Sequence, residues 1–265
     1  LLNRRNRTMA NQVAKKEDAP LAISNEDLFA FAGQGTEKLG TEDLAIPFIN
    51  ILQSNSPQLI KRDGKYIEGS EVGMLFNTVT NEIFNGEEGV DVIPCAYQRT
   101  LVEWVPRDQE GGFVESHDPE SGILAGSTKN ERGQDVLPNG NYLANTASHY
   151  IILLSPTYGP TQAVVSMTST QLKKSRRWNT QMVSQTMTLP NGSVKPMPSF
   201  ASVYNLQTVP ESNKHGNWYG YNIGERRAAS SDEFQIGAAF YKAVMSGTVK
   251  AQAPDVETET DEVPF

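Results

Sequence analysis

Four cationic side chains and an indole stand within six consecutive residues of this chain: Lys173, Lys174, Arg176, Arg177 and Trp178. Lysine and arginine bind the phosphate oxygens of nucleic acids, and a flat aromatic ring offers a surface on which an unpaired base stacks. Lys174 and Trp178 are four residues apart, so they share one face of a helix. The cluster predicts a groove for single-stranded DNA with Trp178 exposed in it, although the cations alone would also suit an ordinary solvated helix face.

A second group of aromatic residues follows on a predicted β-hairpin, and two arginines come just after it. We assign all of them to the same DNA-binding groove: Tyr204, Trp218, Tyr219, Tyr221, Arg226 and Arg227. Alternation along a strand places Tyr219 and Tyr221 on one face and Trp218 on the other. One face would then stack bases while the other fills the core. Core packing is the commoner role for any single aromatic ring.

The elements that must position these residues are mainly strands. Runs rich in Val, Ile, Phe, Tyr and Trp, bounded by Gly, Pro, Asn and Asp, predict strands over 46–52, 73–78, 89–97, 100–105, 149–154, 162–167, 200–209 and 217–223. Residues 168–185 change to a helical period, and a capping-box pattern at Ser230–Glu233 begins another helix that ends at Gly247. A short helix is predicted to begin at Ser24. This pattern favours a mainly β fold, a β-barrel of the OB type, with a few helices and long insertions.

The chain divides into three predicted parts. Residues 1–23 are expected to be a disordered N-terminal extension, in which Met9 and Ala10 resemble a natural start. Residues 24–247 form one OB-like domain for single-stranded DNA, with an inserted loop at about 106–140 that is polar and rich in turn residues. Residues 248–265 form an acidic tail that is expected to be disordered.

The charges are distributed unevenly. The net charge of −8 argues against a nucleic-acid partner when it is taken alone. However, residues 17–135 contain 22 acidic and 8 basic residues, whereas residues 136–210 contain no Asp or Glu at all. Phosphate contacts act within a Debye length of about 8–10 Å, so the local charge decides. The acid-free segment therefore predicts a one-sided surface that binds anions.

The last eleven residues, Asp255–Phe265, carry five acids and no base. Such a segment has too little apolar surface to fold alone. A terminal aromatic ring beside a free carboxylate suits a pocket lined with bases on a partner protein. We therefore predict that the end of the tail binds partners, through Asp261, Glu262, Val263, Pro264 and Phe265. The alternative is an acidic end that only promotes solubility.

This tail resembles the C-terminal tip of bacterial and phage single-stranded-DNA-binding proteins, which is an acidic run closed by an apolar residue, Pro and Phe. The resemblance covers about eleven of the 265 residues. It implies an OB-fold core that coats single strands and a tail that recruits replication enzymes, namely a polymerase, a helicase or primase, or a recombinase. Bacterial members carry a long Gly/Pro/Gln-rich linker, whereas here only residues 248–254 precede the acids, and the body is longer than a minimal OB domain. Both departures suit a phage replication protein.

Other protein classes receive less support. The chain contains no phosphate-binding loop, no Gly-x-Ser-x-Gly, no His-Glu-x-x-His and no paired cysteines, so we expect no enzyme, cofactor or metal. Asp91 and Glu103 on neighbouring predicted strands suggest a magnesium-dependent nuclease as a minor alternative. A virion or other structural protein is the main alternative.

The single cysteine, Cys95, excludes a disulfide within the chain and a cysteine zinc cluster. This favours a reducing, cytoplasmic setting, which is the host cytoplasm for a phage-encoded protein. No apolar run approaches the roughly 20 residues that cross a bilayer, so no membrane partner is expected. A homo-oligomer is a further expectation.

Overall fold

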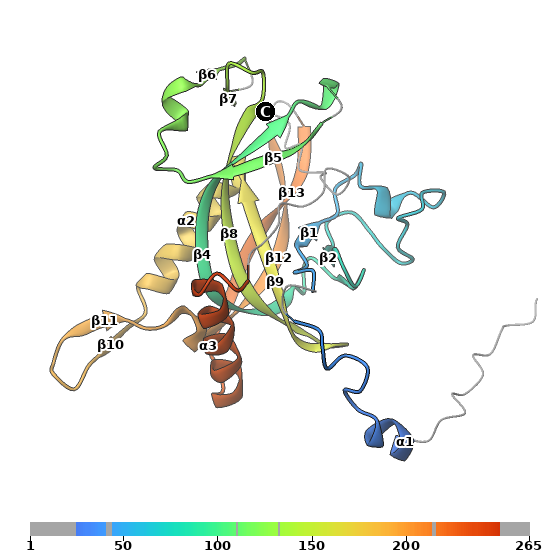
Figure 1. Ribbon diagram of the computed structural model, residues 1–265, viewed down its shortest axis with the longest axis vertical. Coiled ribbons are helices and arrows are strands. Elements are labelled where there is room, and N and C mark those ends of the chain that lie inside the picture. Colours follow the sequence, from blue (N-terminus) through green and yellow to red (C-terminus); the bar gives the residue numbers. More distant parts are fainter. Residues whose placement is uncertain (1–24, 41–43, 110, 132, 214–215, 250–265) are drawn as a thin grey trace, which may run out of the picture. The chain divides into compact units, whose positions relative to one another are not determined.

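The computed structural model describes residues 25–40, 44–109, 111–131, 133–213 and 216–249 (Figure 1). The chain separates into two units, residues 1–40 and residues 41–265. The first unit contains helix α1 (Asn25–Ala30), which begins where the sequence predicts a helix after Ser24. The predicted N-terminal extension 1–23 and the tail residues from 250 onward lie outside the described residues.

The second unit is organised around an eight-stranded antiparallel sheet. Its order is β13 (Gly216–Ala228), β12 (Ser202–Asn213), β4 (Val90–Val105), β8 (Tyr142–Ser155), β7 (Asp135–Val136) and β6 (Thr128–Lys129), while β5 (Gly112–His117) pairs with β4 and β9 (Gly159–Thr168) pairs with β8. The long strands β4 and β8 pair from Val92–Leu153 to Trp104–Tyr142 and form its centre. The sheet curls into a half-barrel (Figure 1). The predicted mainly β, barrel-like fold is therefore confirmed.

Strand β4 joins two strands that the sequence predicts as separate. Polar residues interrupt the apolar pattern between Tyr97 and Thr100, yet they stay paired with β8. The register shifts between Pro94 and Ala96, so one extra residue forms a bulge there. A bulge bends a strand and raises its twist, which allows a sixteen-residue strand to follow the curl.

The predicted loop at 106–140 contains short strands as well as turns. It holds β5, β6 and β7 and two 3₁₀ turns, η3 (Arg107–Gln109) and η4 (Ile123–Gly126). The ring of Phe113 on β5 packs edge-on against Trp104 of β4, with centroids 5.9 Å apart. This contact and the ladder between the two strands give the segment an order that its polar composition does not reveal.

Smaller elements complete the second unit. A three-stranded sheet contains β1 (Ile49–Ile51), β2 (Leu75–Asn77) and β3 (Ile83–Phe84), of which the sequence predicts the first two. A separate hairpin is formed by β10 (Thr186–Thr188) and β11 (Val194–Pro196). Three further 3₁₀ turns are η2 (Pro57–Leu59), η5 (Ser169–Gln171) and η6 (Ser199–Ala201). No helix among the described residues has the length and apolar character to cross a membrane.

The inner face of the curl is filled by helix α2 (Leu172–Val183) and by β1 and β2. One buried cluster combines Trp178 of α2 with residues from both ends of the curled sheet, among them Met167 of β9 and Tyr221 of β13. Ile49 of β1 and Leu75 of β2 belong to the same cluster and are completely buried. The inner face is therefore core.

The outer face is covered by helix α3 (Ser231–Met245), whose predicted capping box is confirmed. Ser230 accepts a hydrogen bond from the Glu233 amide, and the Glu233 carboxylate accepts one from the Ser230 amide. Phe240 of α3 packs in a second buried cluster with β4 and β8. Gly237 allows this close approach, because a Cβ there would lie 2.7 Å from the Cβ of Phe200. Both faces of the sheet are thus covered near its middle.

Candidate nucleic-acid interface

Helix α2 presents three of its four predicted cations to solvent. Ser175 and Trp178 are buried against the sheet, so the two residues between them point outward. Lys173, Arg176 and Arg177 are exposed, and none of them forms an ion pair with another described residue. This exposed trio is called the cationic face of α2 below. It can bind anions without first breaking a salt bridge.

Lys174 does not belong to this face. Its Nζ lies 2.8 Å from Oε1 of Glu211, and its side chain is only 19 % exposed. Oε2 of the same carboxylate accepts hydrogen bonds from Trp218 Nε1 and Gln171 Nε2. Burial raises the pKa of Glu211, but the hydrogen bond and charge of Lys174 outweigh this effect and the pKa is lowered. Lys174 therefore joins α2 to β12, and a phosphate would have to displace Glu211 to contact it.

Trp178 is completely buried, so the prediction that it lies exposed in a DNA-binding groove is wrong. Its indole stacks on the ring of His149 at 4.5 Å and meets Tyr204 edge-on at 5.9 Å. Burial lowers the pKa of His149 to about 3, so this imidazole is neutral, with Nε2 2.8 Å from the Ser175 hydroxyl. The physical reason is the helix itself: its cations lie on the opposite side, and the indole is the large apolar group that can attach α2 to the sheet.

The rings predicted on the hairpin are likewise mostly core. Tyr204, Tyr221 and Trp218 are 2, 3 and 9 % exposed. The Tyr221 hydroxyl donates to the Ile49 carbonyl at 2.7 Å. Tyr219 is half-buried and packs on the same cluster as Tyr221, as alternation predicts, but that cluster lies inside the curl. Since α2 and the β1–β3 sheet cover the inner face, Tyr204 and Tyr221 have no free area there on which to stack bases.

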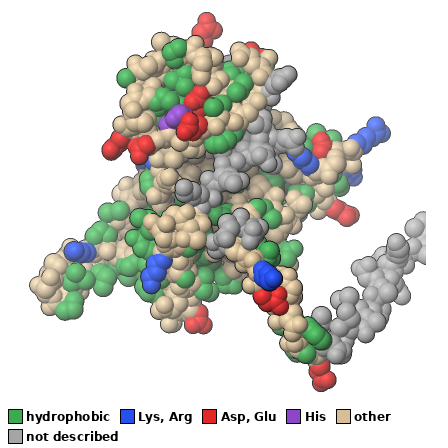
Figure 2. Space-filling view, in the orientation of Figure 1, with side chains coloured by type: hydrophobic (Ala, Val, Ile, Leu, Met, Phe, Trp, Pro, Cys, Tyr) green, Lys and Arg blue, Asp and Glu red, His purple; other side chains and the backbone are tan. Residues whose placement is uncertain are grey.

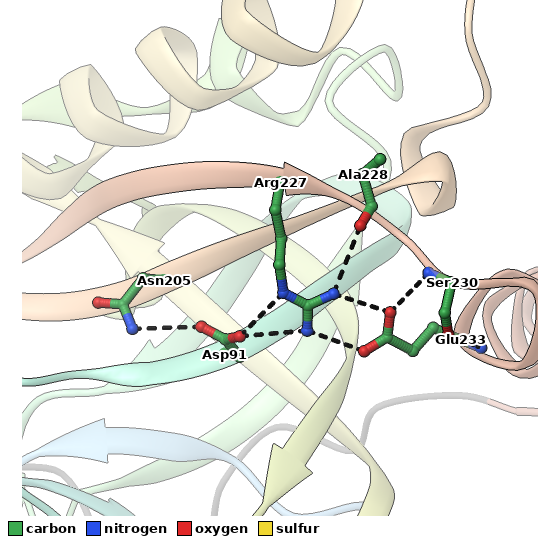
Figure 3. A network of polar contacts seen from close by, with 6 residues as sticks. All are labelled: Asp91, Asn205, Arg227, Ala228, Ser230 and Glu233. Carbon is green, nitrogen blue, oxygen red and sulfur yellow. Dashed lines mark hydrogen bonds and ion pairs between the residues drawn. The ribbon is translucent and has the colours of Figure 1, made fainter.

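Arg226 and Arg227, at the end of β13, have different surroundings. Arg226 is exposed and donates to the Ser202 hydroxyl at 2.8 Å. Arg227 lies between two carboxylates, Asp91 of β4 at 3.2 Å and Glu233 of α3 at 2.8 Å. Figure 3 shows the guanidinium between them, with Glu233 also held by Ser230.

This network changes the acid–base properties of its members. The hydrogen bond from Arg227 is the main cause that lowers the pKa of Glu233 to about 2. The same hydrogen bond raises the pKa of Arg227 above its ordinary value. Arg227 thus joins β13, β4 and the start of α3, so a phosphate would have to compete with Asp91 and Glu233 for it. Arg226 remains available for a phosphate.

Sequence reasoning missed Tyr97 and Arg99, which lie two residues apart on β4. The Tyr97 ring is 45 % exposed and lies 5.1 Å from the ring of His149, which stacks on Trp178. Arg99 is exposed, and its Nε donates to Asn145 Oδ1 at 2.9 Å. Strand β12 pairs with β4 only as far as Val92, and β5 begins pairing at Leu101, so among the described strands only β8 pairs with this stretch. The polar break that interrupts the strand pattern was the available signal.

The two acids considered for a nuclease do not meet. Both Asp91 and Glu103 lie on β4 rather than on neighbouring strands, and twelve residues separate them, which is about 40 Å along a strand. Glu103 is buried, and it is hydrogen-bonded to Asn141, Asn139 and His117. The Asn141 hydrogen bond is the main cause that lowers its pKa. The part of the chain that the structure describes holds no group of three His, Cys, Asp or Glu side chains suited to a metal ion.

The predicted partner-binding residues Asp261–Phe265 lie outside the described residues. What the structure describes is a half-barrel with a helix fixed in its curl and a cationic face turned outward. The chain belongs to the Pam3 phage gp34-like protein family, whose model matches residues 15–250, and it is therefore a phage protein. No match was found among curated proteins or among solved structures.

Proposed function

We propose that this phage protein binds single-stranded DNA during replication or recombination and that it does so without catalysis. The observation that carries the proposal is the cationic face of α2, with Lys173, Arg176 and Arg177 exposed in a segment that has no acid from 136 to 210. Each cation that neutralises a phosphate releases a counterion, and this supplies most of the affinity of sequence-independent binding. None of these three cations forms an ion pair with another described residue, so all three are available to a polyanion.

Base contacts are assigned to the exposed side chains of β4 in place of the buried rings. Tyr97 offers a ring that is 45 % exposed, and Arg99 lies on the same side of the strand two residues later. A base stacked on an aromatic ring contributes about 1–3 kcal/mol, and an arginine adds a cation–π contact or a phosphate contact. The ring of His149, which contacts both Tyr97 and Trp178, links this position to the underside of α2.

The tail supplies the second part of the proposed function. Its acidic run ending in Pro264-Phe265 would recruit replication proteins of the phage or host, such as a polymerase, a helicase or primase, or a recombinase. This part rests on the resemblance of the tail to the tip of single-stranded-DNA-binding proteins. A phage protein with this role would act in the host cytoplasm.

The experiment is a fluorescence-anisotropy titration with labelled oligo-dT and with duplex DNA at several salt concentrations. The parent protein is expected to prefer the single strand. A triple variant, K173Q/R176Q/R177Q, should bind more weakly, and its plot of log affinity against log salt should be shallower by about 2, because each single-strand phosphate contact contributes about 0.7. The matched control is K61Q/R62Q/K65Q, which removes three exposed cations from another region of the chain and should change little.

Two results would contradict the proposal. An unchanged salt slope in the α2 variant would place the DNA-binding surface elsewhere. No binding of any single strand at low salt, together with assembly into large particles, would favour a virion or structural protein instead.

A further inference from the structure

The β10–β11 hairpin is an arm whose apolar side chains have no cover. Its two strands pair only with each other among the described strands, and every residue of both strands is exposed. Met187 and Val194 are 42 and 63 % exposed. Figures 1 and 2 show the arm extending from the end of α2, with hydrophobic side chains along it. A two-stranded hairpin is marginally stable alone, so contact with a partner would stabilise this one.

A second uncovered apolar surface lies in the segment that the sequence predicts as a loop. We define the acidic lobe as residues 112–131 and 133–136, which contain β5, η4, β6 and β7. Phe113, Val114 and Leu124 in this lobe are 43, 44 and 40 % exposed. β5 pairs with β4 on one edge, and no described strand pairs with its other edge. The apolar residues are accompanied by exposed carboxylates, which are Glu115, Asp118, Glu120 and Glu131.

We propose that the arm of one copy of this chain docks on the acidic lobe of a second copy. The two surfaces are complementary in charge, because the arm carries Lys195 and follows the cationic face of α2 within an acid-free segment, whereas the lobe is acidic. The two surfaces also resemble each other in composition. Each has exposed apolar side chains beside a strand edge that pairs with no described strand. Opposite charges favour this pairing over arm-to-arm or lobe-to-lobe contact, in which like charges meet.

The geometry makes the association head-to-tail. The arm and the lobe lie at different ends of the second unit (Figure 1), so each copy that uses its arm on a neighbour leaves its own lobe free. Such a heterologous contact builds a row of subunits rather than a closed pair, unless the rotation closes a ring. The contact is small, so it is expected to be weak between free molecules. If the proposed function holds, a bound strand would raise the effective concentration of neighbours and make binding cooperative.

The test uses the full chain without DNA, so it does not depend on the proposed function. Sedimentation velocity over a concentration series should show an average sedimentation coefficient that rises with concentration, more strongly at low salt than at high salt. The arm variant M187D/V194D and the lobe variant V114D/L124D should each weaken association about tenfold or more, because each buries an unpaired carboxylate in the contact. The variant V72D/V79D, which places the same charges on exposed valines elsewhere, is the control and should associate like the parent.

Mixing the variants separates this arrangement from any other dimer. An arm variant keeps its lobe and a lobe variant keeps its arm, so an equal mixture should form a one-to-one complex that does not grow. The exchange of charges gives an independent check: K195E and E115K should each weaken association, and their mixture should restore it. Sedimentation of the parent that is independent of concentration at low salt, variants that match the control, or mixtures that restore nothing would each overturn the proposal.

Discussion

The part of the chain that the structure describes contains two Arg-Arg pairs, and they have opposite surroundings. Arg176 and Arg177 lie exposed on α2 and form no ion pair with another described residue. At the end of β13, Arg227 bridges carboxylates from β4 and α3, and Arg226 donates to a hydroxyl of β12. The same dipeptide is thus an accessible cationic surface on α2, whereas at the end of β13 it connects neighbouring elements through ion pairs and hydrogen bonds.

The two pairs show that a cationic residue in the sequence is not always available to a ligand, because a carboxylate of the same protein can already pair with it. Two of the predicted DNA-binding cations, Lys174 and Arg227, already pair with Glu211 and Asp91, and both acids lie far from these cations in the sequence. A phosphate that competed for Arg227 would leave two carboxylates without their partner. The cationic face of α2 carries no such cost, so the interface should be sought there.

The largest expected effect comes from the residue that holds this face in place. Trp178 is completely buried between His149 and Tyr204, so W178A should lower the free energy of unfolding by about 3–5 kcal/mol in urea titrations. Single-strand affinity should fall as well, because α2 loses its attachment to the sheet. Y158A removes a ring that is 57 % exposed and serves as the control. If W178A matched Y158A in stability, the indole would not be core.

Sequence patterns predicted the elements better than their contacts. The capping box at Ser230–Glu233 and the helical period of α2 depend on residues three or four apart, so both can be predicted from a short stretch of sequence. The burial of Trp178 depends on a sheet that curls around it, and the ion pair between Arg227 and Asp91 joins residues 136 positions apart. Neither the burial nor the ion pair can be predicted from the adjacent residues in the sequence. The predicted cations on the outer side of α2 remained accessible, whereas most of the predicted rings became core.

The second effect sharpens the contrast between the two Arg-Arg pairs. R227Q should destabilise the protein by about 1–2 kcal/mol, because it removes charge-assisted hydrogen bonds to Asp91 and Glu233, which are partly screened at this half-exposed position. Its single-strand affinity should stay close to that of the parent. R177Q should show the reverse pattern, with unchanged stability and weaker binding. Urea unfolding and anisotropy on the same two proteins measure both quantities.

The pH dependence of the unfolding free energy tests whether the effect of R227Q requires the charge of Glu233. The pKa of Glu233 is lowered from 4.5 to about 2, mainly by the hydrogen bond from Arg227. The stabilisation is therefore present above pH 4.5, and it is lost as the pH falls through about 2. The difference in unfolding free energy between the parent and R227Q should be largest near neutral pH and should shrink as the pH falls from 4.5 toward 2. A difference that stayed constant over this range would mean that the charge of Glu233 is not involved.

The smallest effect on stability, and the one that decides the base contact, is expected at Tyr97. Y97A should change the free energy of unfolding by less than about 1 kcal/mol, since the ring is 45 % exposed, but it should lower single-strand affinity by about 1–3 kcal/mol. Y97F keeps a ring and should bind like the parent, because stacking does not need the hydroxyl. The salt slope should not change in either variant, since neither alters a phosphate contact. Equal affinity of Y97A and the parent would leave the cations of α2 as the interface and remove the aromatic contact from it.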